Sequence, residues 1–464
     1  MKILPVEKEI LLYKEGFDDT DVLQRARTGE ALSNLVDTVT DPLVITIDGR
    51  WGVGKSYFLK RWVGAHKLQN DGISNTVYFD AFSQDYMGDP LTSLISAIED
   101  RIPDAGKPQF QRVKNAAFSL ARPLTRIGLS VATFGATEAL GDLGDAVAGA
   151  VGSEASSRVD RFWQREANRH TAMVEFGNAL TDLIKCSSSN ETAALVPLTV
   201  VVDELDRCRP DYALEVLEVI KHFFAIPGVH FVLGTNLRAL EQSVVARYGA
   251  GLDAEAYLRK FIDLRLTLPS NLGDRYNDRP ASIIYLEHQI KQMQVPDHLA
   301  TKLKRHLDRL IKSNDISIRD VGKILSGLML ANATVREKKN WKSGWLEVLI
   351  ELIVCRVVRP DLYEQFRDCK ISSDQLLTYY GGSRDNLNEY NGDVRNPSYN
   401  HEMCFMFWTW RLLCADPAVD ELGADMKNWV FNQFDNRGGS GEVSHIPQTI
   451  ERDWIDVLSF YGQT

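Results

Sequence analysis

The sequence has few cysteines and no long apolar run. Its six cysteines are scattered, with no C-x-x-C pair and no histidine cluster at ligand spacing, so neither a disulfide framework nor a zinc site is expected. No signal-peptide core forms near the start, because Glu7, Lys8 and Glu9 interrupt the apolar residues there. A formal net charge of -10 argues against a protein whose whole surface coats nucleic acid, and it leaves room for a local basic patch. These features are typical of a cytoplasmic globular protein.

The segment from Asn115 to Gly152 is rich in alanine and glycine, yet it holds no apolar run of the length that a membrane span requires. Its longest uncharged stretch runs from Ile127 to Thr137, and acidic residues follow it. A transmembrane helix needs about 20 predominantly apolar residues. We therefore expect a helical insertion within residues 103–170 that packs on itself or on another subunit, without integral membrane insertion.

A glycine-rich motif, GRWGVGKS, follows the apolar run from Leu43 to Ile47 and precedes a helical pattern. A phosphate-binding loop requires strand, glycine-rich turn and helix in this order. Glycines let the backbone close around phosphate oxygens, with its N–H groups turned inward at the start of the helix. Lys55 would neutralise the β- and γ-phosphates of a nucleoside triphosphate, and the Ser56 hydroxyl would bind Mg²⁺. The expected nucleotide-binding residues are Gly49, Trp51, Gly52, Val53, Gly54, Lys55, Ser56 and Tyr57.

An acidic motif, DELDR, follows the apolar run from Leu198 to Val202. A carboxylate at the carboxyl end of a core strand, beside a phosphate loop, holds the water shell of Mg²⁺. We assign this role to Asp203, so that Ser56 and Asp203 form the expected metal site. Glu204 is the expected general base that orients and deprotonates the attacking water. For this stretch taken alone, an ordinary acidic strand end is the alternative.

Three further polar residues are candidates for the catalytic site. Asn236 follows the apolar run from Val229 to Gly234, where an amide at the tip of a strand can reach the γ-phosphate or its attacking water; a turn-forming asparagine is the alternative. Arg259 lies where a helical pattern runs into a short strand, and it is a candidate for stabilising transition-state charge at its own nucleotide or a neighbouring subunit's. Arg319 opens an amphipathic helix and is a candidate second sensor. For both arginines the alternative is a charge on a solvated helix surface.

Several stretches of the sequence together resemble the KAP family of P-loop ATPases. They are IDGRWGVGKSYFL at 47–59, FDAFSQ at 79–84, VVVDELDRCRPDYALEVLEVIKHFF at 200–224, HFVLGTN at 230–236 and YLRKFIDLRLTLP at 257–269. The element DELDRCRP with its trailing helix is the specific one, because a generic phosphate-loop protein does not need it. The resemblance implies ATP rather than GTP as the nucleotide, with Mg²⁺, and it supports the roles given above for Lys55, Ser56, Asp203, Glu204 and Asn236.

The resemblance also implies the fold class: an α/β P-loop NTPase core with an additional strand in a parallel sheet of the STAND and AAA-plus type. A helical lid and a mainly helical C-terminal domain would follow. We expect a helical lead-in at 1–40, the core at 41–270, the lid at 271–345 and the C-terminal domain at 346–464. Members of the family often place transmembrane helices between the two nucleotide-site motifs, and the insertion expected here departs from that pattern.

The expected function is that of an ATPase acting as a molecular switch, which hydrolyses ATP to change its own assembly or a partner. The resemblance implies a bacterial setting and a role in anti-phage defence. We also expect self-association, and unknown effector proteins encoded nearby as partners. Three alternatives stay open: a membrane-proximal signalling scaffold, a DNA-remodelling ATPase, and a structural subunit that binds ATP without turnover. Lipid binding by residues 115–152 would favour the first, and DNA-stimulated turnover would favour the second.

Overall fold

The computed structural model describes residues 2–5, 9–18, 21–101, 107–117, 120, 171–185, 196–272, 278–334, 343–382, 399–415, 432–434 and 443–456. The expected insertion at 103–170 lies outside these residues, apart from 107–117 and 120. The chain divides into two compact units. We call Ile10–Leu268 the sheet unit, and Pro269–Thr464 together with Met1–Glu9 the helical unit.

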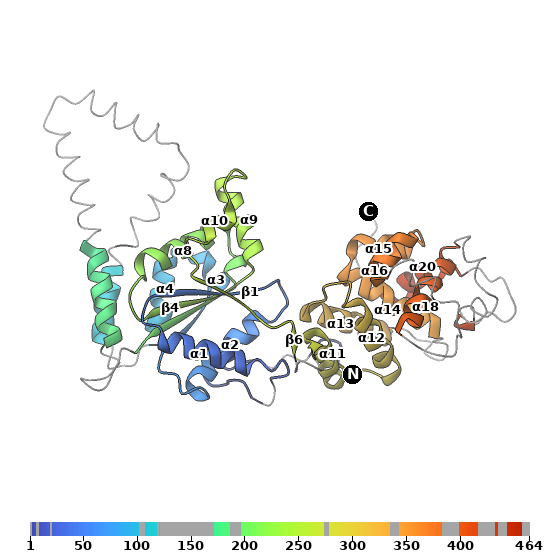
Figure 1. The fold of residues 1–464 in the computed structure, drawn as a ribbon, viewed down its shortest axis with the longest axis horizontal. Helices are drawn as coiled ribbons and strands as arrows, with labels where there is room; N and C mark the ends of the chain where they lie inside the picture. Colours follow the sequence, from blue (N-terminus) through green and yellow to red (C-terminus); the bar gives the residue numbers. More distant parts are fainter. Residues whose placement is uncertain are drawn as a thin grey trace, which may run out of the picture. The chain divides into compact units, whose positions relative to one another are not determined.

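A 5-stranded parallel sheet forms the centre of the sheet unit, with the strand order β2-β3-β4-β1-β5 (Figure 1). Branched and aromatic side chains dominate its inner strands, as expected of strands that are buried on both faces. Because β3 and β4 lie between β1 and β2, the sheet carries an additional strand beside the strand that leads into the glycine-rich loop. The strands are β1 (Leu43–Asp48), β2 (Asn75–Asp80), β3 (Leu198–Asp203), β4 (Val229–Thr235) and β5 (Leu264–Thr267).

Alternate strand residues face opposite layers of helices. Val200 and Val202 belong to the core on the side of α4 and α8, whereas Val201 and Val232 belong to the core on the side of α1 and α2. Figure 1 shows α8 and α10 on one side of the sheet and α1 and α2 on the other. The helices of this unit include α1 (Ala26–Thr38), α2 (Lys55–Leu68), α3 (Ala81–Gln84), α4 (Pro90–Glu99), α8 (Pro210–Phe223), α9 (Leu237–Tyr248) and α10 (Ala254–Leu258), with short 3-10 turns η1 (Asp85–Met87) and η3 (Leu205–Arg207). Residues 107–117 and 171–185 are helical as well.

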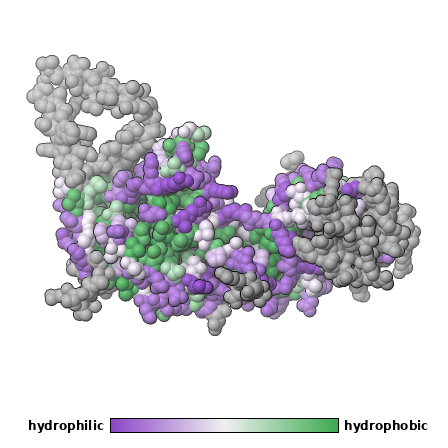
Figure 2. Space-filling view, in the orientation of Figure 1, coloured by the Kyte–Doolittle hydropathy of each residue, from purple (hydrophilic) through white to green (hydrophobic). Residues whose placement is uncertain are grey.

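The surface of the sheet unit is not uniformly polar. Figure 2 shows apolar residues gathered between α8 and α2, over the region of the sheet, with hydrophilic residues at their border. Single aromatics are also exposed: Trp51, in the glycine-rich loop, is 51% exposed, Phe82 51% and Tyr86 79%.

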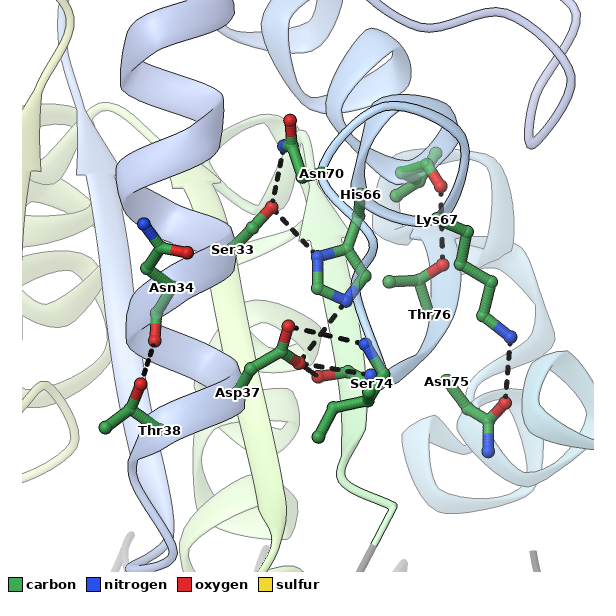
Figure 3. A network of polar contacts seen from close by, with 12 residues as sticks. Ser33, Asn34, Asp37, Thr38, His66, Lys67, Asn70, Ser74, Asn75 and Thr76 are labelled. Atoms are coloured by element: carbon green, nitrogen blue, oxygen red, sulfur yellow. Dashed lines mark hydrogen bonds and ion pairs between the residues drawn. The ribbon is translucent and has the colours of Figure 1, made fainter. Parts of the chain in front are cut away.

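A buried polar network joins α1 to α2 (Figure 3). The Ser33 hydroxyl of α1 lies 2.9 Å from Nδ1 of His66 on α2, and it accepts hydrogen bonds from Trp62 Nε1 at 3.1 Å and Asn70 Nδ2 at 3.0 Å. With two donors already on its oxygen, the hydroxyl gives its one proton to His66 Nδ1. Nε2 of His66 lies 3.6 Å from Asp37 Oδ1, which is too long for a hydrogen bond.

Ser33, His66 and Asp37 have the residue types of a Ser-His-Asp hydrolase triad, but they do not form a catalytic site. Ser33 and His66 are both 0% exposed, so no substrate reaches them. The Ser33 oxygen is also occupied by the Trp62 and Asn70 donors, and Asp37 accepts the backbone N–H of Ser74 at 3.1 Å. The network is therefore structural, and it fixes α1 on the helix that follows the glycine-rich loop.

The helical unit has its own apolar core, which extends from Ile283 to Ile450. Within it Glu351 is 0% exposed and accepts hydrogen bonds from His306 Nε2 at 3.1 Å, from Tyr379 at 2.7 Å and from Tyr380. Burial would raise the pKa of Glu351, but His306 and the two hydroxyls hold it below its ordinary value. The elements are β6 (Asn271–Leu272), β7 (Arg279–Pro280), α11 (Ala281–Met293), α12 (Asp297–Leu310), α13 (Ile318–Thr334), α14 (Ser343–Val358), α15 (Pro360–Arg367), α16 (Ser373–Tyr380), α18 (Tyr399–Leu413), α20 (Ile446–Ile450) and the π-helical η6 (Glu451–Ile455).

Among the helices in the described part of the chain, none has both the length and the apolar character needed to cross a membrane.

Candidate nucleotide-binding site

The glycine-rich loop joins the carboxyl end of β1 to the start of α2. Gly52 and Gly54 have φ values of 89° and 87°, in the left-handed region that side chains with a Cβ rarely adopt. A backbone that alternates into this region turns successive N–H groups toward one side and forms an anion-binding concavity. Since Gly54 also caps α2, the positive end of that helix dipole points into the same concavity.

The Lys55 side chain folds back over the loop. Its Nζ donates to the carbonyl of Gly49 and, at 3.2 Å, to the carbonyl of Arg50. Burial lowers the pKa of Lys55, and the carboxylates of Asp206 and Asp203 act in the opposite direction. An ammonium that donates to loop carbonyls is a cation that a phosphate group can recruit, so the loop fits the polyphosphate of a nucleotide.

Asp203 ends β3 on the face that carries α2, since it has the same parity as Val201. Its carboxylate is hydrogen-bonded to the Ser56 hydroxyl, accepts the Tyr78 hydroxyl at 2.6 Å and accepts the backbone N–H of Glu204 at 2.9 Å. Burial raises the pKa of Asp203, and these three hydrogen bonds lower it. A hydroxyl and a carboxylate beside a phosphate loop are the oxygen ligands that Mg²⁺ prefers, so the residues fit a nucleotide-bound metal ion.

Glu204 adopts a backbone conformation that is unusual for a residue with a side chain. Its φ is 59°, a left-handed value of the kind that often marks functional sites. Its carboxylate forms an ion pair with Arg207 at 2.8 Å. Burial raises the pKa of Glu204, and Arg207 lowers it. The carboxylate is therefore at the correct edge of the sheet for a general base, but its charge is already paired.

Asn236 follows β4, at the same edge of the sheet as Asp203. Thr235 pairs with Asp48 at the end of β1, so Asn236 comes directly after the strand between the two acidic strand ends. Its carbonyl accepts the N–H groups of Ala239 and Leu240 in the first turn of α9, and its side chain makes no capping hydrogen bond. The amide stays a predicted sensor for the γ-phosphate side of the site.

Arg259 lies at the opposite edge of the sheet from the glycine-rich loop. It precedes β5, whose first residue Leu264 pairs with Ile45 in the first half of β1. The N–H of Asp263 donates to the carbonyl of Val44, also near the start of β1. Parallel strands all begin at one edge, so Arg259 is not brought to the nucleotide site of its own chain. Its guanidinium pairs with Glu255 at 2.6 Å.

Arg319 lies in the first turn of α13, which belongs to the helical unit. Its role as a second sensor stays a prediction.

Two further residues of the expected nucleotide-binding set contact other parts of the sheet unit. Trp51 in the loop donates its indole N–H to Asp206, and the ring of Tyr57 on α2 packs against the guanidinium of Arg61 at 5.2 Å.

Sequence reasoning missed three residues at this site. Tyr78 holds the Asp203 carboxylate, Arg207 pairs with Glu204, and Arg25 donates to the carbonyls of the glycine-rich loop. Arg207 has a signal in the sequence, because it ends the DELDR motif. Tyr78 and Arg25 have none, because each reaches a partner that lies far away in the chain.

The parallel sheet with its additional strand and the loop between β1 and α2 define a P-loop NTPase. The sequence model of the KAP family P-loop domain matches residues 25–335, and the chain belongs to this family. The prediction of the family and of the fold class is thereby confirmed. No curated protein matches the chain at a significant level.

Among solved structures, the chain is similar to the Aeropyrum pernix ORC2 protein in its ADPNP–ADP complexes, at 13% identity and a TM-score of 0.35, over 94% of this chain and 88% of that one. It is also similar to the ADP form of the same protein, at 15% identity and a TM-score of 0.34, over 91% of this chain and 98% of that one.

Proposed function

We propose that the protein binds ATP with Mg²⁺ and hydrolyses it as a conformational switch. The observation that carries this proposal is the loop between β1 and α2, with Gly52 and Gly54 in the left-handed region and the Lys55 ammonium folded back over it. Ser56 in the first turn of α2 interacts with Asp203 at the end of β3 beside this loop, so a hydroxyl and a carboxylate that could hold a nucleotide-bound metal ion already converge.

Each residue has a specific task in this proposal. When bound, the nucleotide would supply the bond to its γ-phosphate that is broken, and its metal ion would supply positive charge that polarises this bond. The backbone N–H groups after Gly52 bind phosphate oxygens, and the Lys55 ammonium leaves the loop carbonyls to join them. Ser56 and Asp203 would hold the metal ion and its water shell. A carboxylate oxygen of Glu204 accepts the proton of the attacking water.

The Glu204 base must be released before it can act. A carboxylate that is paired with Arg207 at 2.8 Å is both less basic and partly occupied. This supports slow intrinsic hydrolysis, with turnover depending on a change that separates the pair. Such behaviour is that of a switch rather than of a high-turnover enzyme.

Self-association belongs to the same proposal. Arg259 is remote from its own glycine-rich loop, so any catalytic role for it requires the nucleotide site of a neighbouring subunit. Membership of the KAP family supports a bacterial anti-phage setting with effector proteins encoded nearby. The membrane-proximal scaffold, the DNA-remodelling ATPase and the structural subunit without turnover stay as alternatives.

The test compares Mg²⁺-dependent ATP binding and phosphate release between the wild-type protein and Lys55→Ala. The variant should lose at least about tenfold in affinity, because it removes the cation that is mobile enough to reach the β- and γ-phosphates. Lys67→Ala, at the exposed end of the same helix, is the matched control. Equal binding and turnover by Lys55→Ala and Lys67→Ala would show that the site is misassigned.

A further inference from the structure

Arg25 immediately precedes α1 and is buried, with 1% of its surface exposed. Its Nη1 donates to the carbonyl of Gly54 at 2.9 Å, and its Nη2 donates to the carbonyl of Val53 at 2.7 Å. The guanidinium lies so close to the loop that a Cβ on Gly54 would be 2.8 Å from Nη1. Gly54 therefore satisfies two requirements, a left-handed backbone and the close approach of Arg25.

The two carbonyls belong to the peptide groups that matter for anion binding. The Val53 carbonyl shares a peptide plane with the N–H of Gly54, and the Gly54 carbonyl shares one with the N–H of Lys55. In a trans peptide the carbonyl and the N–H point in opposite directions. The Gly54 carbonyl also accepts the N–H of Phe58 at 3.0 Å, and Arg25 holds this carbonyl and that of Val53 on the same side of the loop, so that both N–H groups point to the other side.

Charge strengthens the effect of this geometry. Burial lowers the pKa of Arg25 to about 10, so the guanidinium stays protonated at neutral pH. A charged donor on a carbonyl polarises the peptide group and makes its N–H a stronger donor. The Gly54 and Lys55 N–H groups thus face the phosphates with enhanced positive character, and a fixed cation lies behind them.

The backbone that carries Arg25 is anchored at two points. The carboxylate of Asp21 accepts the backbone N–H of Arg25 at 2.6 Å and that of Ala26 at 3.1 Å. Four residues further along α1, the Gly29 carbonyl accepts the indole N–H of Trp62 on α2 at 3.0 Å. Arg25 and the loop therefore belong to one rigid assembly of α1 and α2.

We propose that Arg25 is the positioning residue of the phosphate loop: its planar fork orders the Val53 and Gly54 peptide groups and thereby sets the affinity for the polyphosphate chain. This inference rests on the proposed nucleotide-binding function and deepens it. It assigns part of the affinity to a residue that does not touch the nucleotide.

Arg25→Lys and Arg25→Met test the inference. The first keeps a charge but loses the planar fork, and the second loses both. Dissociation constants for Mg·ADP and for inorganic pyrophosphate are measured well below the melting temperature. Arg25→Met should weaken both by at least about tenfold, and Arg25→Lys should retain part of the affinity. Arg27→Met, at an exposed position two residues further on, should bind as the wild type does.

The outcomes separate this inference from the proposed function. A residue that serves stability alone would lower the melting temperature and leave the dissociation constants of the folded protein unchanged, and that result would overturn the inference. If Arg25→Met does not fold, Arg25→Lys decides alone by the same criterion. Lys55→Ala is measured in parallel: unchanged binding there overturns both assignments, whereas lost binding there with wild-type affinity in the folded Arg25 variants overturns only the role of Arg25.

Discussion

The guanidinium of Arg207 lies 2.8 Å from the Glu204 carboxylate, within the short turn that follows β3. The two residues are three positions apart, so the pair forms without any other part of the chain having to move. The carboxylate of the proposed base, Glu204, is thus paired with a cation of the same DELDR motif. Opening this pair requires only a rotation of side chains, which a bound nucleotide or a neighbouring subunit can favour.

Arg207→Ala should change the pH dependence of hydrolysis. Arg207 lowers the pKa of Glu204 against the larger effect of burial, so its removal should raise that pKa. Glu204 acts as a base only when ionised, and the acidic limb of the kcat profile should therefore move upward by about one pH unit. Arg112→Ala, which breaks an exposed ion pair with Asp182, is the control. An unmoved acidic limb in Arg207→Ala would remove the pair from the mechanism.

Glu204→Gln should separate binding from chemistry. The amide keeps the shape of the side chain and cannot accept the proton of water, so hydrolysis should fall by about a hundredfold or more. The affinity for Mg·ATP should stay near that of the wild type. Single-turnover phosphate release and equilibrium binding measure the two quantities. A fully active variant would move the base to another carboxylate, with Asp206 as the first to test.

Tyr78→Phe should raise the Mg²⁺ requirement. The Tyr78 hydroxyl donates to Asp203 and lowers the pKa of that carboxyl, so the variant should hold the metal less well, by about threefold to tenfold in half-maximal Mg²⁺ concentration. The deficit should grow as the pH falls, because a carboxyl with a higher pKa is protonated sooner. Tyr86→Phe, at a position 79% exposed, is the control. Identical Mg²⁺ titrations for the two variants would contradict this role.

Mixing experiments should reveal whether Arg259 completes a neighbouring site. Arg259→Ala and Glu204→Gln subunits are each expected to be impaired alone. A mixed interface would place an intact Glu204 opposite an intact Arg259, so combining the two proteins should restore part of the activity. Activity per wild-type subunit should also rise with protein concentration. A monomeric mass in the presence of ATP, together with no rescue, would leave Arg259 as a surface charge paired with Glu255.

His66 should make the stability of the sheet unit depend on pH. Burial lowers the pKa of His66 from its ordinary value of 6.5. Below pH 6.5 the unfolded chain binds a proton that the folded chain does not, so the stabilisation is complete above this pH and is lost as the pH falls. The free energy of unfolding of the sheet unit should fall between pH 7 and pH 5, by up to about 1.4 kcal/mol per pH unit, and by less in His66→Gln. The transition of this unit is identified as the one that added ADP shifts. His222→Gln, at an exposed position, should keep the wild-type dependence.

The sequence predicts the parts of this site that short contiguous motifs encode. The apolar runs at 43–47, 198–202 and 229–234 correspond to β1, β3 and β4 within one residue at each end, because buried strands require continuous branched side chains. The glycine-rich motif predicts its loop, since only glycine enters the left-handed region without strain. Asp203 and Ser56 then meet because parallel strands end at one edge.

The contacts that the sequence does not predict depend on tertiary packing. Tyr78 on β2 donates to Asp203 on the neighbouring strand β3, and the register of these two strands is known only from the structure. Arg25 donates to backbone carbonyls, which every residue has, so the residue types in the loop do not identify its partners. Arg259 has a plausible local pattern, but its edge of the sheet is fixed by the pairing of β5 with β1.

The helical unit is discontinuous along the chain, since Met1–Glu9 precede the sheet unit and Pro269–Thr464 follow it. Pro5 packs against α13, where its ring lies 3.3 Å from the position that a Cβ on Gly322 would take. During synthesis the first residues therefore leave the ribosome long before their partner helix exists. Domains generally fold as units while the chain emerges, and the sheet unit is complete once Leu268 has been made. The order of translation thus favours a phosphate loop that is already formed when Met1–Glu9 meet Pro269–Thr464.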